Sequence, residues 1–260
     1  MKTLLVVMLF FSDFWICLAT NPDSATNASK KASFVHGEEL MYSMRYGPIH
    51  GGNASIQLSM TRLNNKPVYH ARAEAKSVGI TDLLFRIEDI YESYFDPVSC
   101  LPYKAVRNVS EGSYKYYNEV YFDQDKNLAV SQKSGKISVP KGILDMVSSL
   151  YYVRNMQLDT LKKGDTIQIT TYFGDEIFPF PLRYRGKENV KTSLGKYHCY
   201  RFDPVVEVGR IFSSPDDMSV WISADNNCVP IRVKFDLIVG SVCCDLVGYK
   251  NLAYKLKTVE

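Results

Sequence analysis

Apolar and polar residues alternate with a period of two over most of this chain, which is typical of half-buried β-strands. Four apolar residues share one face of the first such stretch: Leu40, Tyr42, Met44 and Tyr46. The pattern recurs along the chain, at residues 54–60, 68–78, 87–95, 114–122, 218–223, 229–235 and 242–249. Glycine, proline and asparagine clusters separate these stretches and are typical of turns. Roughly a dozen short strands predict a mainly β protein, an antiparallel meander that curls into a barrel or half-barrel.

One segment follows a different period and predicts the principal helix, at about residues 142–156. Its apolar residues recur at steps of three and four, which places them on one stripe of a helix: Ile143, Met146, Val147, Leu150 and Val153. An acidic residue begins the segment and a basic one ends it, as the helix dipole favours. A lone amphipathic helix among strands buries its stripe against a sheet, so we expect this helix to pack inside the curve. Residues 77–85 predict a short additional helical turn.

The first 19 residues predict a secretory signal peptide. Lys2 gives a short positive region, residues 4–11 form an apolar core, and small residues follow at Cys17 and Ala19. Lipidation at Cys17 is the rival interpretation, disfavoured because Ile16 precedes it where a small residue is required. Residues 20–33 are small and polar without a period, which predicts a disordered tether. We then expect residues 34–260 to form a single β domain of a protein that is exported, either periplasmic or associated with the outer membrane.

The composition of the chain argues against some classes of partner and bears on the state of its cysteines. The net charge is +3, from 31 basic and 28 acidic residues without a block of like charge, which argues against nucleic acid. No apolar run after the signal is long enough to span a membrane as a helix. Five cysteines follow the signal: Cys100, Cys199, Cys228, Cys243 and Cys244. We interpret all five as reduced, with no disulfide, because free cysteine behaves as a small apolar residue; one disulfide that involves Cys199 is the alternative.

The sequence contains no recognisable catalytic or cofactor motif. The four histidines lack the spacing of a metal site: His36, His50, His70 and His198. Residues 123–127 begin like a calcium loop, but Leu128 stands where glycine is required and Ser134 where glutamate is required. We therefore expect no metal and no cofactor, and we favour a non-catalytic protein. The alternative is a hydrolase without a known motif, with His70 or His198 beside a carboxylate or serine in a cleft.

Four residues are candidates for ligand binding: Trp221, Tyr151, Tyr152 and Arg232. Trp221 falls on the more polar face of its strand, and Arg232 lies on the same face of the next strand. A tryptophan there either packs under a loop or the helix, or stacks on a ligand. Tyr151 and Tyr152 are neighbours on the predicted helix and cannot face the same place. We expect Tyr151 to pack and Tyr152 to lie at the helix edge.

Several short motifs, taken together, resemble those of one bacterial family. They are Gly37-Glu38-Glu39-Leu40-x-Tyr42, residues 91–97 (YESYFDP), residues 145–154 (DMVSSLYYVR), and Val220-Trp221-Ile222-Ser223-x-Asp225 before Pro230. The chain is similar to the exported proteins known as domain of unknown function 3108, over the whole of the predicted domain. The resemblance implies a YmcC-like antiparallel β fold and a cell-envelope location in a Gram-negative bacterium. It implies no activity, substrate or catalytic residue.

We therefore predict a binding module of the cell envelope, for an apolar or amphiphilic ligand such as a lipid, or for an envelope protein. The alternatives are the hydrolase described above and a structural or assembly protein, which would expose an apolar patch or a bare sheet edge. The sequence leaves open whether the curved sheet encloses a cavity or is filled by the helix, because strand number and shear decide this.

Overall fold

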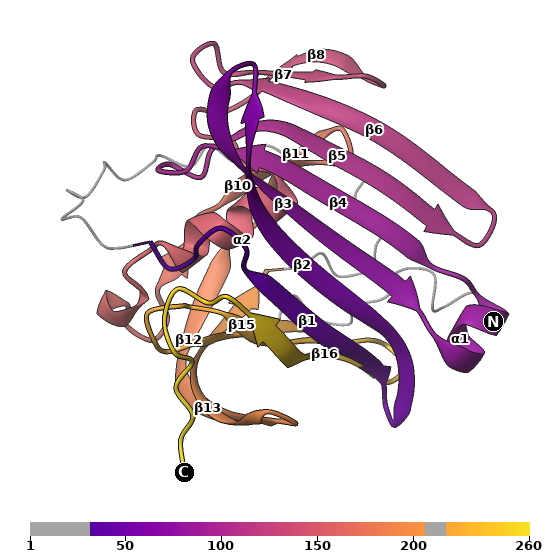
Figure 1. The fold of residues 1–260 in the computed structure, drawn as a ribbon, viewed down its shortest axis with the longest axis vertical. Coiled ribbons are helices and arrows are strands. Elements are labelled where there is room, and N and C mark those ends of the chain that lie inside the picture. The colour runs from indigo at the N-terminus through magenta and orange to yellow at the C-terminus, as the bar shows by residue number, and fades with distance from the viewer. Residues whose placement is uncertain (1–31, 206–216) are drawn as a thin grey trace.

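Fourteen strands form one antiparallel sheet in the residues that the computed structural model describes, 32–205 and 217–260 (Figure 1). The strand order is β8-β7-β6-β5-β4-β3-β2-β1-β16-β15-β14-β13-β12-β9. The end strands β8 and β9 are not paired with each other, so the sheet is curled but open. The predicted mainly β fold, a meander that curls into a half-barrel around one principal helix, is confirmed.

The sheet has two wings, which meet where β1 pairs with β16. The N-terminal wing contains β1 (Glu39–Tyr46), β2 (Ile49–Leu63), β3 (Lys66–Ser77), β4 (Glu88–Phe95), β5 (Pro102–Glu111), β6 (Tyr114–Asp123), β7 (Leu128–Ser131) and β8 (Gly135–Ser138). The C-terminal wing contains β9 (Thr166–Ile167), β12 (Leu182–Thr192), β13 (Gly195–Pro204), β14 (Met218–Ser223), β15 (Pro230–Asp236) and β16 (Ser241–Lys250). A separate hairpin consists of β10 (Thr170–Phe173) and β11 (Glu176–Pro179). The helices are α1 (Gly79–Leu84), α2 (Met146–Arg154) and the 3₁₀ turn η2 (Leu158–Thr160).

Helix α2 begins at Met146 because Asp145 caps it. The Asp145 carboxylate accepts hydrogen bonds from the amides of Val147 at 2.7 Å and Ser148 at 2.9 Å, and the Ser148 hydroxyl accepts one from the Asp145 amide at 2.9 Å. This reciprocal arrangement is a capping box. Asn155 caps the other end, so α2 covers Met146–Arg154. The helix is shorter than the predicted range of 142–156, mainly because it starts after Asp145.

The face that α2 buries differs from the expected stripe. Met146 is 36% exposed, whereas Tyr151 and Arg154 are fully buried. Both wings contact the helix and therefore cover more than one of its sides. Val147 and Tyr151 pack in a cluster with residues of the N-terminal wing, and Val153 packs in a cluster with residues of the C-terminal wing. Figure 1 shows α2 between the two wings, where it occupies the interior of the curve.

The predicted signal peptide, residues 1–19, and most of the predicted tether lie outside the described residues. Ser33, the last residue of that tether, is instead fully buried. Its hydroxyl donates a hydrogen bond to the carbonyl oxygen of Arg154 at 2.8 Å, and its amide donates to the side-chain oxygen of Asn155 at 3.2 Å. The packed domain therefore includes Ser33. None of the helices in the described part of the chain is long and apolar enough to cross a bilayer.

Candidate functional site

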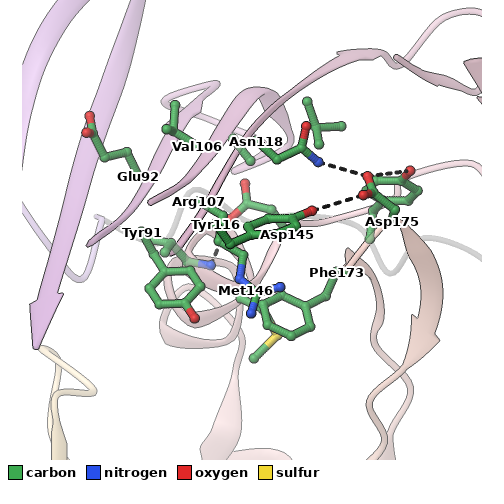
Figure 2. A pocket seen from close by; sticks show the side chains of 15 residues that line it. Tyr91, Glu92, Val106, Arg107, Tyr116, Asn118, Asp145, Met146, Phe173 and Asp175 are labelled. Carbon is green, nitrogen blue, oxygen red and sulfur yellow. Dashed lines mark hydrogen bonds between the residues drawn. The ribbon is translucent and has the colours of Figure 1, made fainter. Parts of the chain in front are cut away.

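An arginine lies on the inner face of the N-terminal wing, among apolar neighbours. Arg107 of β5 stands opposite Tyr91 of β4 and Asn118 of β6. Alternation along β5 places Ala105 and Val109 on the same face. The register of three neighbouring strands therefore directs a charged side chain into the interior, toward Met146 at the start of α2 (Figure 2).

Three aromatic rings surround the guanidinium of Arg107. Its central carbon lies 4.7 Å from the ring centre of Tyr116, 4.9 Å from that of Phe173 and 5.9 Å from that of Tyr91. Each distance is within the range of a cation–π interaction. The Nε atom of Arg107 is buried, and no group of the described residues accepts a hydrogen bond from it. A buried N–H group without an acceptor is costly, so this atom offers a free donor to a ligand.

A cavity of about 50 Å³ lies beside this arginine, between the sheet, the start of α2 and the β10–β11 turn. Tyr91, Arg107, Tyr116, Met146 and Phe173 contribute to its lining (Figure 2). This volume has room for about one or two water molecules, or for one small polar group. The interior next to α2 is therefore largely filled by side chains, and a whole lipid chain does not fit in this cavity.

Asp175, in the β10–β11 turn, fastens the hairpin to the wall of the cavity. Its carboxylate accepts hydrogen bonds from Ser131 Oγ at 2.6 Å, Asn118 Nδ2 at 2.9 Å and the Tyr116 hydroxyl at 3.0 Å. Burial alone would raise the pKa of Asp175, but the hydrogen bonds from Ser131 and Tyr116 outweigh it and hold the pKa below its ordinary value. Burial, together with the bond to Asp175, raises the pKa of Tyr116 to about 12. The turn thus positions the Phe173 ring over Arg107.

Two buried carboxyl groups lie on the same inner face as Arg107. Asp89 of β4 is fully buried and Glu111 of β5 is 4% exposed. Burial raises the pKa of both groups, and the negative charge of Asp89 adds to the rise at Glu111, whose pKa reaches about 7. Asp89 Oδ2 and Glu111 Oε2 are both buried without a donor. Two such oxygens are compatible when the carboxyl pair shares one proton, which leaves the pair with a single negative charge.

The four sequence-predicted ligand residues lie outside this cavity, in two separate places. Trp221 and Arg232 face each other across β14 and β15. Trp221 is 8% exposed and packs in a cluster with Leu256 of the C-terminal segment; its indole N–H donates to Glu188. Arg232 donates to both carboxylate oxygens of Asp245, at 2.5 and 3.0 Å.

The other two candidates are on α2 and point apart, as expected. Tyr151 is fully buried, and its ring lies 4.8 Å from the ring of Phe34 and 5.1 Å from that of Phe95. Tyr152 is 37% exposed. The structure therefore brings Trp221 and Arg232 together, and it separates them from the two tyrosines. Ligand contact at these four positions stays a prediction.

The histidines of the hydrolase alternative lie on the surface of the sheet. His70 Nε2 is 2.6 Å from Glu92 Oε2, and its ring stacks on Tyr94 at 4.2 Å. His198 is exposed, with Nδ1 2.9 Å from Asn189 Oδ1. Neither histidine is among the residues that line the Arg107 cavity. In residues 32–205 and 217–260, no three His, Cys, Asp or Glu side chains come together as ligands for a metal ion.

The five cysteines in the described part of the chain form no disulfide with one another. Burial raises the pKa of Cys100 and of Cys199 to about 12, so both thiols stay protonated near neutral pH. A reactive cysteine has the opposite property, a lowered pKa in a polar setting. These two residues act as small apolar side chains.

Arg107, Tyr116 and Phe173 were not among the residues predicted from the sequence. One signal could have found Arg107: the alternation of Ala105, Arg107 and Val109 puts a charge on an otherwise apolar face. No local signal could have found Phe173, because it comes from a hairpin outside the main sheet. Its place over Arg107 depends on the tertiary contact that Asp175 makes.

Comparisons with known proteins agree with this fold. A family model described as "Protein of unknown function (DUF3108)" matches residues 41–247, which confirms the resemblance seen in the sequence. Among proteins with curated descriptions, none matches the chain.

The solved structures that are similar to the chain include the following two. The β-barrel-like protein of domain of unknown function DUF1849 from Brucella abortus is 9% identical, covers 85% of this chain and 99% of its own, and has a TM-score of 0.56. A DUF1089 family protein from Pseudomonas aeruginosa is 10% identical, covers 68% of this chain and 87% of its own, and has a TM-score of 0.37. The first likeness shows a shared β-barrel-like fold.

Proposed function

Since this chain belongs to the DUF3108 family of proteins of unknown function, we propose its role from its geometry: it is an exported envelope protein that binds an amphiphile through an anionic head group. The observation that carries the proposal is Arg107, a guanidinium held between aromatic rings with a buried and unused Nε donor. Support for export comes from the sequence of residues 1–19, which has the pattern of a signal peptide.

The surroundings of Arg107 favour a small anionic group over a wholly apolar ligand. The cavity of about 50 Å³ has room for a carboxylate, whose oxygen accepts the hydrogen bond that Arg107 Nε offers. Lys133 Nζ lies 5.0 Å from the ring centre of Tyr116, on which Arg107 also stacks, and adds a second positive charge. Only the head group enters the cavity. The apolar part of the ligand extends out of it, past the aromatic rings that line it.

Binding of radiolabelled palmitate tests the proposal, with hexadecanol as a competitor that has the same chain and no charge. We expect Arg107→Gln to weaken palmitate binding at least about tenfold, as befits a charge-assisted hydrogen bond. We also expect hexadecanol to compete poorly. Circular dichroism of the variant establishes that it is folded.

Arg201→Gln is the matched control. Arg201 also lies over an aromatic ring, 5.4 Å from the ring centre of Trp221, but in the C-terminal wing. Palmitate affinity should stay at the wild-type value in this variant. Loss of binding in Arg201→Gln with retention in Arg107→Gln would contradict the proposal and move the ligand to the Trp221 and Arg232 region. Equal competition by hexadecanol would contradict the anionic head group.

A further inference from the structure

A second cavity of the N-terminal wing is an open groove of about 250 Å³, beside the tip of the β2–β3 hairpin. The pairing of β3 with β4 ends at Tyr69, whereas its pairing with β2 continues to Lys66. The hairpin therefore extends past the end of β4, and the groove lies between the hairpin tip and the strands β5, β6 and β7 (Figure 1). No residue lines both this groove and the Arg107 cavity.

A β-bulge places Tyr103 in the wall of the groove. Tyr94 of β4 pairs with Lys104 and Phe95 pairs with Pro102, so Tyr103 is the extra residue on β5. A bulge redirects the side chain of its extra residue, and bulges are common beside functional sites. The position of this tyrosine ring therefore depends on a local departure from the regular sheet.

Tyr121 of β6 supplies a second aromatic ring to the groove. Val120 and Phe122, on either side of it, pack in an inner cluster, so alternation turns Tyr121 to the outer face, where it is 43% exposed. Its hydroxyl donates a hydrogen bond to Glu119 at 2.8 Å, which holds the ring in place. The ring is thus a fixed and accessible apolar surface.

The charges at the groove balance. Six charged residues line the groove or contact one of its lining side chains, three of each sign: Lys66, Lys104, Lys126, Asp96, Glu119 and Asp123. Lys104 pairs with Glu119 at 3.0 Å, and Lys126 pairs with Asp123 at 2.7 Å. A ligand of either sign would meet like charge as well as opposite charge, so this balance favours an uncharged ligand.

We propose that this groove binds a sugar ring of a neutral glycan. The C–H groups of a sugar ring are slightly positive and pack on the negative face of an aromatic ring, here that of Tyr121. Asn64, Lys66 and Asp123 also line the groove, and they offer hydrogen-bond donors and acceptors to the sugar hydroxyls. A wholly apolar ligand would leave these polar groups without partners.

The size of the groove agrees with this class of ligand. Pockets that enclose drug-sized ligands have volumes of about 300–1,000 Å³, lined by apolar and aromatic side chains with a few polar groups. A groove of about 250 Å³ is slightly smaller and suits one or two sugar rings. The proposal does not depend on the ligand of the Arg107 cavity.

An array of neutral and acidic glycans tests the proposal, followed by calorimetry with the neutral glycan that binds best. We expect the wild type to bind neutral glycans with an affinity that ionic strength does not change. Tyr121→Ala should weaken this binding at least about tenfold, because the stacking surface is lost. Tyr121→Phe should stay within about twofold of the wild type, since the hydroxyl binds Glu119 and the ring is kept.

Tyr117→Ala is the matched control. Tyr117 lies on the same strand, is 48% exposed and also donates to Glu119, at 2.6 Å, but it does not line the groove. This variant should bind as the wild type does, and circular dichroism establishes that all three variants are folded. Absence of neutral-glycan binding by the wild type, or equal losses in Tyr121→Ala and Tyr117→Ala, would overturn the proposal. Salt-dependent binding of acidic glycans alone would also overturn it and indicate a site for anions.

Discussion

Arg154 is among the largest fully buried side chains in the described part of the chain, and its charge is matched by Glu38. Two parallel hydrogen bonds join them, from Nη1 to Oε1 at 2.5 Å and from Nη2 to Oε2 at 2.8 Å. The remaining donors reach the carbonyl oxygens of Asn227 at 3.1 Å and Ser33 at 3.2 Å. This one side chain therefore links the start of the domain, the end of α2 and the β14–β15 connection.

Glu38→Gln should destabilise the protein by about 3–5 kcal/mol, because it leaves the buried charge of Arg154 without its counterion. Urea unfolding measures the loss. Glu39→Gln is the control, since the neighbouring Glu39 makes an exposed ion pair with Lys250 at 2.8 Å. The midpoint of the control should stay close to that of the wild type. Similar midpoints for the two variants would show that the buried pair is not what stabilises this junction.

The Asp89–Glu111 pair makes stability depend on pH. Glu111 has a pKa of about 7 in the folded chain against an ordinary value of 4.5, so between these values the folded state holds a proton that the unfolded state has lost. The free energy of unfolding therefore falls as pH rises through this interval, by about 1–3 kcal/mol. Urea unfolding at about pH 5 and about pH 8 measures the difference.

Glu111→Gln should flatten this pH dependence, because the variant has no proton to lose at this position. Glu88→Gln, a half-exposed carboxyl on the strand that carries Asp89, should keep it. Wild-type stability that rises over the interval, or an unchanged slope in Glu111→Gln, would refute the shared proton.

The strands could be predicted from the sequence and the buried face of the helix could not. A strand that is half buried shows its alternation locally, so the first strand was expected from Leu40 to Tyr46 and is observed at Glu39–Tyr46. Helix α2 is enclosed by two wings that come from distant parts of the sequence. A stripe predicted from apolar residues alone therefore missed Arg154, whose burial depends on Glu38 more than a hundred positions earlier.

The candidate site was harder to predict than the fold for the same reason. Arg107 is recognisable only when its face of β5 is known to be the inner one, and Phe173 joins it through a hairpin that pairs outside the main sheet. Trp221 was singled out because its strand neighbours Ser219 and Ser223 are polar. Both serines are buried, so the polarity of that face did not indicate exposure.

Strands from the two ends of the described chain pair in the middle of the sheet, whereas the two end strands of the sheet, β8 and β9, do not pair with each other. The first and last strands of the chain, β1 and β16, are neighbours in the sheet, and α2 packs against both wings. A wing could not unfold alone without exposing one side of α2 and the edge of β1 or β16. We therefore expect the two wings to unfold in a single cooperative transition.

Trp221 gives a direct test, because it is the only tryptophan after the predicted signal peptide and lies in the C-terminal wing. Leu58→Ala creates a cavity in the N-terminal wing, where Leu58 is 1% exposed and packs in the cluster of Phe95 and Tyr151. The substitution should lower the free energy of unfolding by about 2–5 kcal/mol. If the wings are coupled, the urea midpoint from Trp221 fluorescence falls together with that from far-UV circular dichroism. Met60→Ala, at a 41% exposed position of the same strand, should move neither. A fluorescence midpoint that stays at the wild-type value in Leu58→Ala would mean that the wings are separate folding units, joined at β1 and β16 but not stabilised by each other.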